Sequence, residues 1–151
     1  MERLLLESFL EAVRNSVGAN LWKIFWVKED TGNVRDVLED GNLSCAYFVT
    51  SLLKLFNHLK EVHFTVDSAV KAMKEEGWEE VAKENLHLGD VLVWEEKQEK
   101  ECNVPHRHIG FYVGNNQAVS NSSKKKCPIE HHYTYKGKRK IILVLRRGGS
   151  V

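Results

Sequence analysis

The stretch Gly41–Val49, which reads GNLSCAYFV, decides the fold of this chain. A polar turn runs there directly into apolar residues with helical spacing, which predicts a helix over residues 44–58. Asn42 or Ser44 can cap this helix. Cys45 then lies at the helix start, where the positive end of the helix dipole favours a thiolate. Cys45 is therefore a candidate nucleophile.

The rest of the chain divides into a helical first half and a strand-rich second half. Helices are expected over residues 3–17 and from a cap at Thr65 or Asp67 through residue 76, where Gly77 follows. Short apolar runs then predict strands over 91–94, 107–113, 117–121 and 141–145. Residues 28–42 and 95–106 are expected to be loops, and 122–135 to be irregular. Helices followed by an antiparallel sheet indicate a single α+β domain over residues 1–151.

A second candidate catalytic residue opens one of the predicted strands. His108 begins the run HIGFYVG, which ends at Gly114. An imidazole beside a thiolate completes the ion pair that makes a sulfur nucleophilic. His106 shares the face of His108 by two-residue alternation and is the obvious substitute.

A third residue is needed to orient the imidazole. If Asn115 and Asn116 form a two-residue hairpin turn, Gly114 pairs with Gln117 and paired residue numbers add to 231. Asn121 then lies on the face of His108, and its side-chain oxygen can accept the imidazole N–H. A register change of one residue would favour Ser120 instead.

The ordered set of Ser44–Val49 (SCAYFV), Gly89–Trp94 (GDVLVW) and His108–Gly114 (HIGFYVG) resembles the NlpC and CHAP groups of papain-like cysteine peptidases and amidases. In those groups a cysteine starts a core helix, a Gly-Asp turn leads a strand, and a histidine opens the next strand. The resemblance covers roughly residues 40–121. It departs from the family in the residues flanking Cys45, where NlpC enzymes frequently have Asp-Cys-Ser.

The resemblance implies a papain-like fold in which N-terminal helices pack on a small antiparallel sheet. It implies hydrolysis of an amide bond, with a peptide of peptidoglycan as the typical substrate. Cys45 would attack the carbonyl carbon, its backbone N–H would help to bind the oxyanion, and His108 would transfer protons. The resemblance implies no cofactor.

Composition limits the setting in which the protein acts. With 42% hydrophobic and 28% charged residues, and no apolar run of membrane length, the chain is expected to be globular, monomeric and without a membrane partner. The first residues lack the pattern of a secretory signal, so synthesis in the cytoplasm is expected, with lysis or non-classical export as routes out. Residues 1–100 hold 12 Lys/Arg and 19 Asp/Glu, whereas residues 101–151 hold 10 and 2. The basic final third could attract an anionic polymer or simply balance the acidic part.

Other functions remain open on the sequence. Cys102 and His106, like Cys127 and His131, have a Cys-x3-His spacing that could hold structural zinc. The same fold with an unreactive Cys45 could be a non-catalytic binding module. A Cys-His pair also suits a thiol acyltransferase, because the acyl-enzyme does not dictate whether water or an amine accepts the acyl group.

Overall fold

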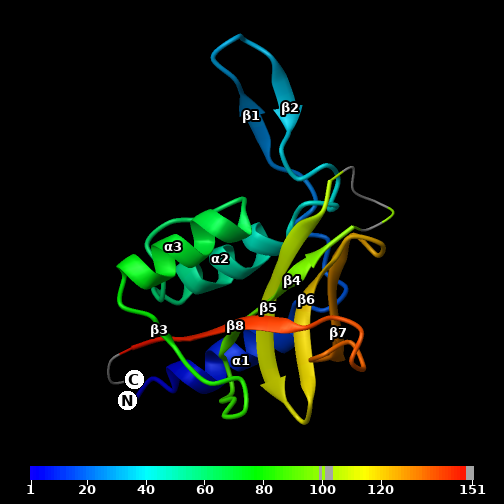
Figure 1. Ribbon diagram of the computed structural model, residues 1–151. Coiled ribbons are helices and arrows are strands. Elements are labelled where there is room, and N and C mark those ends of the chain that lie inside the picture. The colour runs from blue at the N-terminus through cyan, green and yellow to red at the C-terminus, as the bar shows by residue number, and fades with distance from the viewer. Residues whose placement is uncertain (99, 101–103, 149–151) are drawn as a thin grey trace.

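A computed structural model describes residues 1–98, 100 and 104–148 of the chain (Figure 1). Its helices and strands, in chain order, are α1 (Leu5–Asn15), β1 (Trp26–Lys28), β2 (Val34–Asp36), α2 (Cys45–Leu55), α3 (Val66–Glu75), β3 (Glu79–Glu80), β4 (Val91–Lys97), β5 (His106–Gly114), β6 (Gln117–Ser122), β7 (Cys127–His132) and β8 (Ile141–Arg146). The mixed α+β class agrees with the sequence prediction, since helices dominate the first half and strands the second.

The three predicted helices are present, each somewhat shorter than expected. Thr65 caps α3, because its side chain accepts a hydrogen bond from the backbone N–H of Ser68 at 3.1 Å. Ser44 occupies the cap position of α2, but its side chain makes no capping bond. The start of α2 is therefore held in place by contacts other than its own cap residue.

The main sheet is antiparallel, with strand order β3-β8-β4-β5-β6-β7. The Gly-Asp turn before β4 has a structural role in this order. Gly89 takes a φ of +87°, and the buried carboxylate of Asp90 accepts bonds of 2.9 and 2.8 Å from the guanidinium of Arg146. This two-pronged ion pair joins the start of β4 to the end of its neighbour β8.

Two segments differ from the sequence prediction. The region expected to be a loop over 28–42 contains the last residue of β1 and all of β2, whose hairpin projects from the body of the protein (Figure 1). The region expected to be irregular over 122–135 contains β7, which pairs with β6 along its whole length. The strands β1, β2 and β7 carry charged or polar residues that conceal the two-residue alternation. Pairing with a neighbouring strand therefore decided their structure.

The β5–β6 hairpin has the predicted turn but not the predicted register. Asn115 and Asn116 have φ values of 51° and 59°, as a type I′ turn requires, and Gly114 pairs with Gln117. An irregularity between Tyr112 and Gly114 then shifts the pairing by one residue, so that Gly110 lies opposite Ser120. The prediction that paired numbers keep adding to 231 is wrong beyond the turn.

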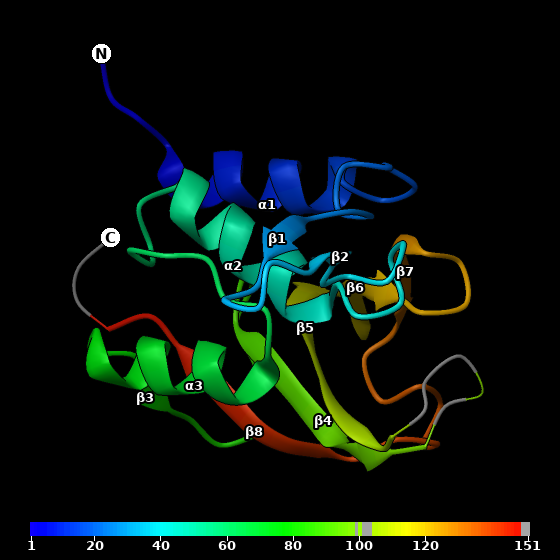
Figure 2. The ribbon, with the colours of Figure 1, turned by 90° about the horizontal axis from the view of Figure 1, so that it is seen from above.

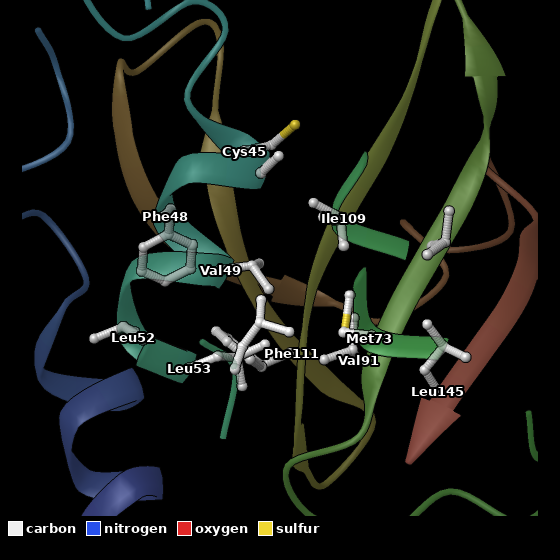
Figure 3. Packing of buried hydrophobic residues seen from close by; sticks show 14 of the residues in the cluster. Cys45, Phe48, Val49, Leu52, Leu53, Met73, Val91, Ile109, Phe111 and Leu145 are labelled. Atoms are coloured by element: carbon white, nitrogen blue, oxygen red, sulfur yellow. The ribbon is translucent and has the colours of Figure 1, made fainter. Parts of the chain in front are cut away.

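The sheet has a different apolar core on each face. The helices cover one face (Figure 2), where α2 residues and Cys45 pack with Ile109 and Phe111 of β5 (Figure 3). The opposite face, here called the inner face, has a smaller core built around Leu92, Trp94 and Ala118. Successive residues of a strand point to opposite faces, so the side chains of β5 enter the two cores alternately.

Within the part of the chain that the structure describes, no helix combines the length and apolar character needed to cross a membrane.

Candidate active site

Cys45 borders a pocket of about 570 Å³ on the helix-covered side of the sheet. It is the first residue of α2, and its side chain is mostly buried, with 9% of the residue exposed. Phe64 and Thr65 form part of the wall before α3, and His106 and Arg107 form the wall at the start of β5. Residues that carry a thiol, an imidazole and a guanidinium therefore border the same pocket.

The dipole of α2 favours an anion at the helix end of this pocket, whose lining holds the carboxylates of Asp67 and Glu96 as well as Arg107. The first turn of α2 contains no acidic residue, and its N–H groups have no acceptor within the helix. Across the pocket, Arg107 of β5 forms an ion pair with Asp67 of α3. A thiolate at Cys45, or an oxyanion bound near its backbone N–H, would therefore meet favourable dipoles.

His106 presents a defined nitrogen for proton transfer when it is neutral. Its Nδ1 lies 3.3 Å from the carbonyl oxygen of Val104. A carbonyl only accepts, so Nδ1 carries the proton in this contact and Nε2 is the basic nitrogen. His106 therefore has the chemistry of a general base on the same pocket as Cys45.

His108 does not face this pocket. Ile109 packs in the core that contains Cys45, so the alternation of β5 directs His108 to the inner face. There its ring lies 5.4 Å from that of Trp94 and 6.4 Å from that of Tyr135, between centroids. The predicted pairing of Cys45 with His108 is therefore not made in this structure, because the sheet lies between the two side chains.

On the inner face, His108 belongs to a chain of hydrogen bonds centred on Ser120. The Ser120 hydroxyl lies 2.9 Å from Nε2 of His108, 2.7 Å from Nε2 of His131 and 3.2 Å from the hydroxyl of Tyr135. Nδ1 of His131 lies 2.8 Å from the carbonyl oxygen of His132 and so must donate to it. Neutral His131 then accepts the Ser120 proton at Nε2, and Ser120 in turn accepts from Nε2–H of His108.

Burial favours the neutral form of both inner-face histidines. Burial, reinforced by the charge of Arg139, holds the pKa of His108 well below its usual value. Burial also lowers the pKa of His131, although its bond to the backbone of His132 acts in the opposite direction. The cluster is buried polar structure with its partners within the fold, rather than an open site.

Asn121 lies on the opposite face of β6 from Ser120. Its Nδ2 donates a 2.9 Å hydrogen bond to the carbonyl oxygen of Gly41, in the loop that leads to Cys45. The expectation that Asn121 orients His108 is corrected by the shifted register, which gives that contact to Ser120. A one-residue change of register was expected to favour Ser120. The contacts of His131 and Tyr135 with Ser120 could not be predicted, because they depend on strand β7.

Among the described residues, no three His, Cys, Asp or Glu side chains form a group that could hold a metal ion. Cys127 is a free thiol at the start of β7. Cys102, the partner of His106 in the proposed zinc spacing, lies outside the described residues.

Comparisons with known proteins support the fold alone. Neither the protein-family models nor the curated proteins give a match. Among solved structures, the chain is similar to NlpC2 from Trichomonas vaginalis, with a TM-score of 0.61 and 14% sequence identity. The match covers 99% of this chain but 49% of that one, so the chain spans about half the length of its structural neighbour. This likeness indicates an NlpC-like fold.

Proposed function

We propose that the protein is a cysteine hydrolase that cleaves an amide bond, with Cys45 as the nucleophile. The observation that carries this proposal is the position of Cys45 at the start of α2, on a pocket that also contains His106 and Arg107. The NlpC-like fold supports it, since that family name is associated with cysteine peptidases and amidases. A peptide of peptidoglycan is the substrate that the sequence resemblance favours.

The pocket suggests which imidazole acts with Cys45. The motif resemblance points to His108, but the pocket contains His106, which was the substitute on sequence grounds. We therefore assign the acid/base role to His106. His108 remains the alternative, and it would require a rearrangement of the start of β5.

The proposed reaction proceeds in two steps. The Cys45 thiolate attacks the amide carbonyl carbon, and the backbone N–H of Cys45 helps to bind the resulting oxyanion. His106, as imidazolium, protonates the departing amine as the C–N bond breaks, which leaves a thioester on Cys45. Neutral His106 then takes a proton from water, and the hydroxide releases the acid and regenerates the thiolate.

The first test is the pH dependence of iodoacetamide alkylation at Cys45, located by peptide mapping. In the wild-type protein, labelling near pH 6 should be fast, because an ion-paired thiolate persists below the ordinary thiol pKa of about 8.5. His106→Ala should slow labelling at pH 6, whereas His108→Ala should leave it unchanged. Cys127 in the same sample serves as an internal control thiol.

Two outcomes would alter the proposal in different ways. If His108→Ala slows the labelling and His106→Ala does not, Cys45 remains the proposed nucleophile and the acid/base role passes to His108. If Cys45 reacts only near pH 8.5 in the wild-type protein, the hydrolase proposal fails.

A non-catalytic binding module is the second candidate. It is favoured by the packing of Cys45 into the core and by the location of His108 on the other face of the sheet. In that case purified peptidoglycan should bind the wild-type protein and Cys45→Ser equally, and no new amine termini should appear. An anionic polymer bound by the basic final third would instead show binding that weakens steeply with salt.

A further inference from the structure

The loop that presents Cys45 has an unusual backbone. Glu39, Asp40 and Gly41 have φ values of 50°, 54° and 93°, three left-handed conformations in succession. Residues other than glycine adopt left-handed φ values at a cost in conformational energy, so surrounding contacts must hold such a loop in place. The cap residue of α2 does not supply them, because Ser44 makes no capping bond.

Asp36 accepts hydrogen bonds from the backbone N–H groups of Leu38 and Asp40 within the loop, and further contacts come from β6 and from the turn between β6 and β7. Asn121 donates to the carbonyl oxygen of Gly41 at 2.9 Å, and Ser123 donates to that of Asn42 at 3.2 Å. The backbone of Lys126 approaches so closely that a Cβ on Gly41 would lie 2.9 Å from its carbonyl oxygen. Segments about eighty residues apart in the chain therefore meet directly before the catalytic helix.

Asn121 is the buried centre of this junction. It is 1% exposed, and its Oδ1 has no hydrogen-bond partner among the described residues. Burying an unpaired acceptor is unfavourable, and the Nδ2 hydrogen bond to Gly41 offsets that cost. Its one polar contact fixes the carbonyl of Gly41, four residues before Cys45.

We infer that Asn121 is a positioning residue, which sets the loop at residues 38–44 and thereby the orientation of Cys45 at the start of α2. The inference rests on the proposed function for its catalytic consequence, since Asn121 would act through Cys45 without touching the substrate. It replaces the role in which Asn121 orients the histidine.

The experiment combines hydrogen exchange with thiol reactivity in the full chain. Asn121→Ala removes the contact from the β6 side, and Gly41→Ala forces the loop away from Lys126. Ser120→Ala is the matched local control, because Ser120 lies next to Asn121 on β6 but bonds to His108 and His131 on the inner face instead. Val144→Ala, in the inner-face core, controls for a general loss of stability.

Loss of the Asn121 contact should speed amide exchange of the peptide covering residues 38–45 about tenfold relative to a peptide of α1. Gly41→Ala should have a similar effect, and the double variant should exceed either single variant by little. The pH midpoint of Cys45 alkylation should rise in these variants, because the thiol is no longer held against the helix start. Neither control should show these changes.

The inference fails if exchange of residues 38–45 is unchanged in Asn121→Ala, or if Val144→Ala changes it equally. It also fails if the two single variants act additively. These outcomes are independent of the hydrolase proposal, which is tested by the wild-type alkylation profile. If Asn121→Ala does not fold, Asn121→Asp takes its place, since it keeps the shape and removes the Nδ2 donor.

Discussion

The end of β5 and the interior of the sheet hold histidines in different surroundings. At the start of β5, His106 lines the pocket that Cys45 also borders. On the inner face, His108 is buried, His131 is half-buried, and both bond to the same serine hydroxyl. Strand alternation alone would place both side chains on one face, so their surroundings differ by position: His106 is the first residue of β5, beyond the register shift between Trp94 and Lys97, and His108 lies within the paired part of the sheet. The histidine in the expected motif, His108, is thus part of a buried hydrogen-bonded cluster, whereas nearby His106 borders the pocket.

The largest effect should come from removing the thiol on the pocket side. Cys45→Ala is expected to lower turnover of a peptidoglycan peptide by about 10⁴-fold or more, because no other thiol of the described residues lines the pocket. Amine release from the substrate measures the change, and circular dichroism checks that the fold is retained. Cys127→Ala serves as the matched cysteine control. Residual turnover near the wild-type level would show that Cys45 belongs to the core alone.

On the inner face, the largest effect should be on stability. Trp94 is fully buried, and its Nε1 donates a 2.7 Å bond to the carbonyl oxygen of Tyr133. Trp94→Ala should lower the free energy of unfolding by about 3–5 kcal/mol through the cavity that it leaves. Urea titration measures this loss. Trp26→Ala, at a position that is 65% exposed in the β1–β2 hairpin, should change stability by less than about 0.5 kcal/mol.

The buried histidines should make stability depend on pH. Since the pKa of His108 is lowered in the folded state, the unfolded state binds the extra proton near its ordinary pKa of about 6.5. The stabilisation is complete above that pH and is lost as the pH falls below it. His108 should account for a loss of about 2 kcal/mol between pH 7 and pH 5.

Urea midpoints at a series of pH values test this dependence. His108→Gln should flatten the profile, and His106→Gln on the pocket side should not. His58, whose burial lowers its pKa to about 4, adds a similar but smaller contribution in both variants. An equal slope in wild type and His108→Gln would contradict the assignment of a neutral, buried His108.

The smallest effect concerns the helix that borders the pocket. Thr65→Ala removes the cap of α3 and should cost about 1 kcal/mol of unfolding free energy. Thermal unfolding measures the loss, with Thr65→Ser as the control that keeps the hydroxyl. Equal stability of the two variants would mean that packing, rather than the cap, holds this wall of the pocket.

The helices and the central strands could be predicted because their residues carry a local signal. The apolar spacing of α2 and the runs before Trp94 and after His108 each specify one element without help from the rest of the chain. The β1–β2 hairpin and β7 lack such a pattern, and their pairing with a partner strand revealed them. The element order alone was enough to indicate an α+β chain.

The sequence by itself determined that a cysteine starts a core helix and that His106 and His108 begin a strand. Only the tertiary structure decided that His106 lines the pocket bordered by Cys45 and that His108 packs against Trp94 instead. A bulge near Gly114 gives Ser120 the contact with His108 and leaves Asn121 to hold the loop before Cys45. The physical reason is the two-residue period of a strand: a shift of one residue exchanges the faces of every side chain that follows.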